Sequence, residues 1–112
     1  MRVQIQISTD HNIEEREAGA AEITADLDAA LARFSDHITR VIVHLADENG
    51  PKSGHDDIRC TLEARIEGRQ PIAASHHADT IPLAVSGAAD TLVSLIESTL
   101  GRTEAIRRRE QR

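Results

Sequence analysis

The side chains best suited to bind a metal ion are the six histidines, of which His76 and His77 are adjacent. On a strand, adjacent side chains point to opposite faces, so these two cannot share a metal alone. Further ligands would have to come from His44, His55, Asp56 or Asp57. The chain has no His-x-x-x-His or Cys-x-x-Cys spacing, and its lone Cys60 is no zinc ligand set. We therefore expect no metal and no other cofactor.

Motifs for catalysis are missing as well. The sequence has no Gly-rich phosphate loop, no nucleophile elbow and no paired carboxylates in an evident pocket. The run from Asp47 to Gly50 lacks the 12-residue ligand spacing of an EF-hand and is typical of a hairpin turn. Cys60 is expected on the inward side of a strand, where a thiol is an inert small hydrophobe. We expect a binding protein, with no enzymatic activity and no small-molecule substrate.

Charge is distributed unevenly along the chain. The formal net charge is -6 and the pI is near 5.4, so the field of the whole molecule repels phosphate. The basic concentration lies at the C-terminal end, in Arg102, Arg107, Arg108, Arg109 and Arg112. Against Glu104 and Glu110 these give the segment a charge of +3. It is either a tether for RNA phosphates or a solvated tail that complements the negative end of the preceding helix.

A second group of arginines is predicted on one face of a sheet, because alternating positions on neighbouring strands share a side. Its members are Arg2, Arg40, Arg59 and Arg65. They could contact RNA, but cross-strand pairing with Glu63 and Glu67 is the interpretation we favour. Phe34 is the single aromatic residue, so no platform exists for stacking unpaired bases.

The elements that must position these residues follow from the spacing of apolar residues. Strand periodicity covers 2–8, 38–46, 58–67 and 72–77, and the fourth strand ends at His76 or His77. Helical spacing covers 14–34 and 79–101. In the second helix, either Leu95 or Ile96 is expected to belong to the buried stripe. Asp79 or Thr80 is the expected N-cap of the second helix, and Gly101 its expected end.

The order β-α-β-β-β-α predicts an α+β fold with a four-stranded mixed sheet and two helices packed on one face. Strands one and two should be parallel, joined by a right-handed crossover. We expect one domain over 1–101 and a basic tail over 102–112. No apolar run approaches about 18 residues, the start has no signal-like region, and Cys60 has no partner. Together these predict a cytoplasmic protein without a membrane partner.

Two stretches of sequence resemble a known family. Asp47-Glu48-Asn49-Gly50-Pro51-Lys52 with Asp57-Ile58-Arg59-Cys60 is similar to the second hairpin of ribosome hibernation-promoting factors, also called ribosome-associated translation inhibitors. Ala78-Asp79-Thr80 with the run from Ala84 to Leu92 is similar to the start of that family's last helix. Together with the element order, the resemblance spans nearly the whole chain and matches the short form.

The resemblance implies a domain that sits on the small ribosomal subunit, in the channel shared by messenger and transfer RNAs, and holds ribosomes idle. It implies a surface of Lys and Arg on the two helices that faces ribosomal RNA. On this chain the candidate RNA contacts are Arg33, Arg59, Arg65, His76 and the tail arginines. His76 falls near a position where family members carry Lys.

The helices of this chain are acidic where the family is basic. Residues 13–36 hold seven acids and two bases, and residues 79–101 hold three acids and no base. Because like charge opposes phosphate, a second hypothesis keeps the fold but assigns a protein-interaction module that uses its negative helices against a basic protein partner.

Overall fold

The computed structural model describes residues 4–9, 19–47 and 57–110, with side chains described up to residue 101. Some predictions therefore fall outside the described residues. Those predictions concern Arg2, His55, Asp56, the hairpin loop at 48–56 and the side chains of the tail arginines.

The element order is the predicted one. It runs β1 (Gln4–Thr9), α2 (Ala20–Leu31), the 3-10 turn η1 (Ala32–Phe34), β2 (Ile38–Asp47), β3 (Ile58–Ile66), β4 (Ile72–Ala78) and α3 (Ile81–Glu110). The helix predicted over 14–34 is realised as α2 and η1. Gly19, whose φ of 60° lies in the left-handed region, precedes the first residue of α2, and residues 14–18 lie outside the described chain.

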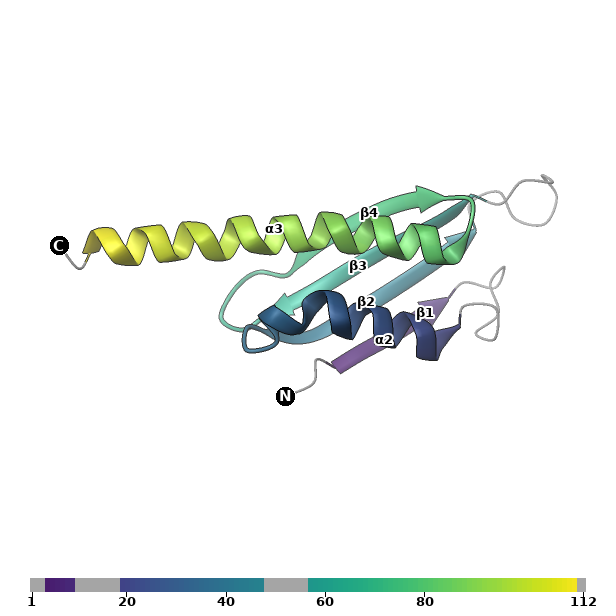
Figure 1. The fold of residues 1–112 in the computed structure, drawn as a ribbon, viewed down its shortest axis with the longest axis horizontal. Helices are drawn as coiled ribbons and strands as arrows, with labels where there is room; N and C mark the ends of the chain where they lie inside the picture. Colours follow the sequence, from purple (N-terminus) through teal and green to yellow (C-terminus); the bar gives the residue numbers. More distant parts are fainter. Residues whose placement is uncertain (1–3, 10–18, 48–56, 111–112) are drawn as a thin grey trace.

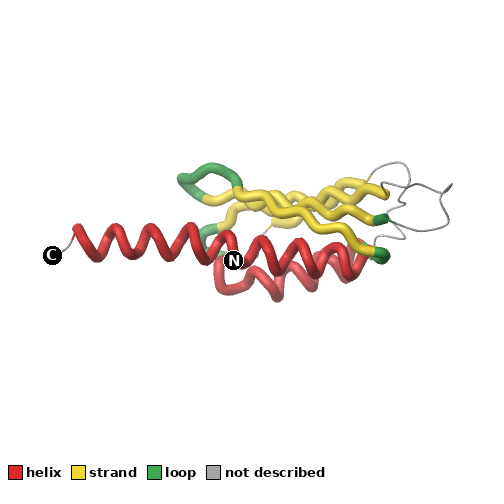
Figure 2. The backbone as a smooth tube through the Cα atoms, turned by 90° about the horizontal axis from the view of Figure 1, so that it is seen from above, coloured by secondary structure: helices red, strands yellow, loops and turns green. Residues whose placement is uncertain are grey.

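The strands form one mixed sheet in the order β1-β2-β3-β4. β1 is parallel to β2, and the β2–β3 and β3–β4 pairs are antiparallel. Both helices cover the same face of the sheet, and the other face is left open (Figure 2). α2 lies over the β1–β2 side and α3 over β3 and β4 (Figure 1). The predicted α+β fold is confirmed.

A register shift in β2 sets which side chains reach the open face. Ile38 pairs with Ile66 and Arg40 with Arg65, so the shift falls between Ile38 and Arg40. Without an extra residue there, Ile38 and Arg40 would share a face, because side chains alternate along a strand. The bulge instead lets Ile38 face the core as Val41 does, while Arg40, which alternates with Val41, faces outward.

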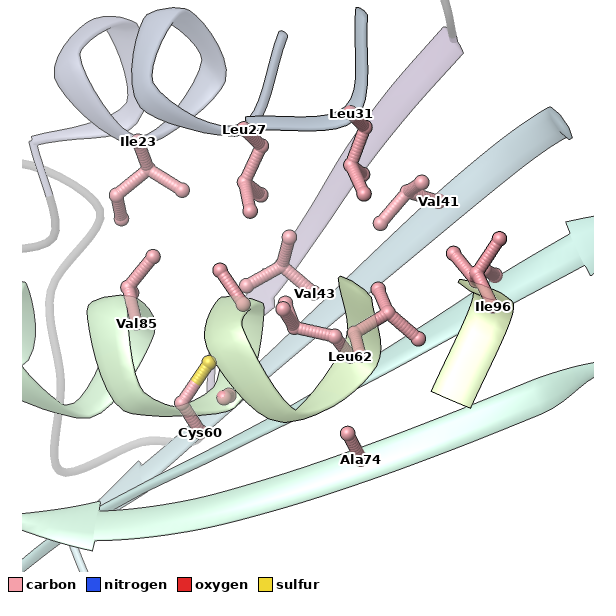
Figure 3. Packing of buried hydrophobic residues seen from close by; sticks show 14 of the residues in the cluster. Ile23, Leu27, Leu31, Val41, Val43, Cys60, Leu62, Ala74, Val85 and Ile96 are labelled. Atoms are coloured by element: carbon pink, nitrogen blue, oxygen red, sulfur yellow. The ribbon is translucent and has the colours of Figure 1, made fainter. Parts of the chain in front are cut away.

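The core lies between the sheet and the two helices, and Figure 3 shows its packing. Leu27 and Leu31 of α2 point down toward Val43 and Val41 of β2. The central strand β3 contributes Ile58, Cys60, Leu62, Ala64 and Ile66, which are all buried. Burying branched apolar side chains on a regular face is the main driving force for this layer arrangement.

α3 begins as predicted and ends later than predicted. The backbone N–H of Leu83 donates to Thr80 Oγ1 at 3.3 Å, so Thr80 is the N-cap. Ile96, rather than Leu95, is the buried residue of the later turns. Gly101 does not end the helix, and the expectation that it would was wrong: α3 continues to Glu110 and projects beyond the sheet (Figure 1).

The projection has a simple physical reason. A 30-residue helix is about 45 Å long, which exceeds the span of the short strands it covers. A single glycine inside a helix costs only about 1 kcal/mol, so it does not by itself terminate the helix.

The segment Ile81–Gly101 is also long and apolar enough, by length and composition, to cross a membrane. Core helices of water-soluble proteins pass the same test. In this fold the apolar stripe of α3, from Ala84 through Leu92 to Ile96, is buried against the sheet.

Candidate nucleic-acid interface

The open face of the sheet collects polar side chains from all four strands. The register aligns the residues of this face, most of them polar, in four cross-strand rows: Gln4, Arg40 and Arg65; Gln6, Ile42, Glu63 and Ala73; Ser8, His44, Thr61 and Ser75; and Ala46, Arg59 and His77. Within residues 4–9, 19–47 and 57–110, no helix covers this face (Figure 2). The predicted lining of Arg, Gln, Thr and Glu is present.

The arginines of the open face form two foci rather than one cluster. Arg40 lies directly opposite Arg65, and Arg59 lies directly opposite His77. Arg59 and Arg65 are six residues apart on β3, which places their Cα atoms about 20 Å apart. The predicted group is therefore split between the two ends of β3.

One acidic side chain, Glu63, lies among the described residues of these four rows. Its Oε1 is 3.3 Å from Arg65 Nη2, on the same strand. Pairing with Glu63 was expected for these arginines, but it was expected across strands. Arg40 and Arg65 remain exposed, and between the two foci lies a neutral stretch in which Thr61 Oγ1 and Ser75 Oγ are 2.9 Å apart.

The adjacent histidines separate as predicted, one to each face. His77 is on the open face, where its Nδ1 lies 3.2 Å from Asp57 Oδ1. His76 pairs with buried Cys60 and so points to the helix side of the sheet. A Cβ atom built on Gly87 of α3 would collide with the His76 imidazole, so the ring packs directly on the helix backbone. His76 does not join Arg59 and Arg65.

Arg33 has partners of its own in the helix layer. Its guanidinium pairs with Glu97 of α3 and lies 4.8 Å above the Phe34 ring centroid. An ion pair and a cation–π contact both hold the side chain against the protein. The structure thus places Arg33 far from the open face and uses it to join η1 to α3.

The helix layer is acidic, as its sequence implied. Over 19–36 and 79–101 the described charged residues are one base, Arg33, and seven acids: Glu22, Asp26, Asp28, Asp36, Asp79, Asp90 and Glu97. A shallow groove runs between α2 and α3, and its lining includes Asp26, Ser86 and Asp90 over an apolar floor. The two faces of the sheet therefore carry opposite charge.

Neither metal chemistry nor thiol chemistry is supported by the arrangement. Within the described part of the chain, no group of three or more His, Cys, Asp or Glu side chains could hold a metal ion. Burial raises the pKa of the Cys60 thiol from 9.0 to about 12, so the thiol stays protonated and unreactive at neutral pH.

Reasoning from the sequence missed two residues of the open face, His44 and His77, as companions of its arginines. The strand period was enough to find them, because both lie at outward positions of their strands. The placement of Arg40 directly opposite Arg65 depended on the register of the β2–β3 pair, for which the residue pattern gave no clear signal.

No protein-family model matches this chain, and no curated protein matches it. Its fold is similar to solved structures. The ribosomal subunit interface protein from Coxiella burnetii aligns with a TM-score of 0.60 and 17% identity, over 92% of this chain and 99% of that one. The Protein Y N-terminal domain from Thermus thermophilus aligns with a TM-score of 0.62 and 17% identity, over 88% and 99%.

Proposed function

We propose that this protein is a ribosome-associated factor that binds the small ribosomal subunit and holds ribosomes idle. The observation that carries the proposal is the fold similarity, which extends over nearly the full length of both chains and includes a protein named for the ribosomal subunit interface. It agrees with the sequence resemblance to hibernation-promoting factors. The proposed action is occupancy of the channel used by messenger and transfer RNAs, in the cytoplasm and without catalysis.

The proposed contacts are positive side chains that meet ribosomal RNA phosphates. The arginines of the open sheet face and those of the 102–112 segment would supply them, because each Arg–phosphate contact releases condensed counterions. The helix layer, with its seven acids, is poorly suited to this contact. Arg33 is omitted from the proposed contacts because it pairs with Glu97.

Cosedimentation tests the proposal directly. Purified protein is mixed with small subunits, large subunits or 70S ribosomes and run through sucrose gradients at low and at moderate salt. We expect comigration with small subunits and 70S ribosomes, and a loss of binding as salt rises. Protein that stays at the top of the gradient with every particle at low salt would refute the proposal. A truncation after Gly101 then measures how much of the affinity the basic segment supplies.

A second candidate function is a module that binds a basic protein through its helices. The observation that favours it is the groove between α2 and α3, where Asp26 and Asp90 flank an apolar floor. Leu83 of α3 is also 59% exposed on this layer. Affinity purification followed by RNase treatment separates the two functions: a basic protein retained after RNase, and lost in a D26N/D90N variant, would favour this second candidate.

A further inference from the structure

We infer that the open sheet face is the surface that meets RNA phosphates, and that α2 and the part of α3 packed on the sheet, Ile81–Gly101, face away from the RNA. The inference rests on the proposed function and assigns its orientation. It reverses the arrangement implied by the family resemblance, in which basic helices face ribosomal RNA. The evidence is the distribution of charge over the two faces of one sheet.

The first argument is electrostatic. Against the seven acids and single base of the described helix layer, the four rows of the open face hold three arginines, Arg40, Arg59 and Arg65, and one acid, Glu63; Asp57 adds a second acid beside His77 at the Arg59 end. The outer surface of a helix packed on a sheet lies more than 10 Å from the open face, about one Debye length at 0.1 M salt. An RNA backbone approaching the sheet therefore meets positive charge locally, although the whole chain carries -6.

The second argument is the position of Arg40 opposite Arg65. Like charges directly opposite each other on a sheet are unfavourable, and Glu63 forms its ion pair with Arg65. Arg40 points outward because it alternates with buried Val41, and the β2–β3 register sets it opposite Arg65. Two adjacent guanidinium groups on an uncovered surface suit an anion with several acceptor oxygens, and a phosphodiester is such a group.

The third argument concerns what kind of RNA contact this face can make. Its described neutral positions offer hydroxyl and amide groups, including Ser8, Thr61 and Gln6, and no Phe, Tyr or Trp ring. Hydroxyls and arginines bind phosphate and sugar, whereas stacking of unpaired bases needs a ring or a flat open platform. The focus of Arg40 opposite Arg65 fits a backbone segment of folded RNA. Recognition should therefore depend on RNA shape and not on base sequence.

The test compares two double variants that change the net charge equally. Arg40→Thr with Arg65→Thr removes two positive charges from the open face and keeps β-branched residues in the strands. Ser86→Glu with Ser98→Glu adds two negative charges to exposed positions of α3. Each variant lowers the formal charge by two. Binding to small ribosomal subunits is measured from 50 to 200 mM salt, and binding to an RNA hairpin of arbitrary sequence is measured in parallel.

We expect the sheet variant to bind small subunits on the order of 30-fold more weakly at 0.1 M salt, with a salt slope lower by about 1.4 to 1.8. The hairpin should show the same loss. The helix variant should change affinity by less than about 2-fold, because its new charges lie beyond a Debye length from the RNA. Arg40→Lys with Arg65→Lys should keep the wild-type salt slope, and thermal unfolding confirms that every variant is folded. If the sheet variant is unfolded, the single variant Arg40→Thr takes its place. The expected decrease in its salt slope is half that of the double variant.

The other outcomes overturn the inference in distinguishable ways. Suppose that the wild type binds subunits and that only the helix variant loses affinity, or that both variants bind as well as the wild type. The proposed orientation is then wrong, and the proposed function stands. If the sheet variant loses subunit binding but the wild type does not bind the hairpin, the face contacts an acidic protein and not phosphate. If the wild type binds no ribosomal particle, the proposed function and the inference fail together.

Discussion

Replacing Gly87 with alanine should destabilise the protein through a collision with His76. A Cβ atom at Gly87 would overlap the imidazole, including its Cγ atom, so the ring must leave its present rotamer or α3 must shift. Overpacking of this kind costs about 1–3 kcal/mol. Alanine also gains about 1 kcal/mol over glycine in a helix interior. The net expectation is a loss of up to about 2 kcal/mol in the free energy of unfolding.

Removing the imidazole of His76 should turn the effect of Gly87→Ala on the free energy of unfolding from destabilising to stabilising. In a His76→Ala background the space beside Gly87 is open, so Gly87→Ala should stabilise the protein by about 1 kcal/mol through helix propensity alone. His76 is exposed, and its own replacement should change stability by less than about 0.5 kcal/mol. The coupling energy between the two substitutions is then about 1–3 kcal/mol.

Urea unfolding of the wild type, both single variants and the double variant measures this coupling. His77→Ala provides the matched control, because His77 is the neighbour in sequence but lies on the opposite face of the sheet. Its coupling to Gly87→Ala should be close to zero. A coupling below about 0.5 kcal/mol for His76, or an equal coupling for both histidines, would show that the ring does not pack on Gly87.

Three further predictions concern the core and the helix layer. Leu62→Ala should cost about 2–5 kcal/mol in urea unfolding because Leu62 is fully buried, whereas Leu83→Ala at its 59%-exposed site should cost less than about 0.5 kcal/mol. Arg33→Ala should cost under about 1 kcal/mol, and a double-mutant cycle with Glu97→Ala should show a small coupling that salt weakens, because the pair is exposed. Burial raises the pKa of the Cys60 thiol from 9.0 to about 12 in the folded state, so below pH 9 this group adds no pH dependence to stability. As pH rises from 9 toward 12, the thiol of the unfolded state loses its proton first, and the free energy of unfolding should fall by about 1.4 kcal/mol per pH unit. Cys60→Ala should remove this slope.

Much of the fold was predictable from local periodicity. The alternation in 58–66 has no faults, and in the structure Ile58, Cys60 and Leu62 are buried on one face as predicted. Helix ends were less predictable, because the free-energy preference of a single residue for ending a helix is small compared with the packing energy of the helix. Gly101 disfavours a helix by about 1 kcal/mol, which is too little to stop a helix that is already packed along most of its length.

The candidate interface was predicted in part. The sequence placed Arg40, Arg59 and Arg65 on one face, and the structure agrees. It also suggested His76 as a companion, which the structure places on the other face against Gly87. Nothing in the sequence indicated that Arg33 pairs with Glu97, because the two residues are 64 positions apart. Contacts between distant segments require knowledge of how the layers pack.

The sequence by itself determined the element order, the buried stripe of each element and the separation of His76 from His77, because these follow from side-chain periods of 2 and 3.6 residues. Only the tertiary structure decided the cross-strand register. The β2–β3 register sets Arg40 opposite Arg65 at one end of the open face, and the packing of α3 on β4 leaves room only for glycine beside the His76 ring. Register and close approach depend on distances between segments, which no local pattern of residues contains.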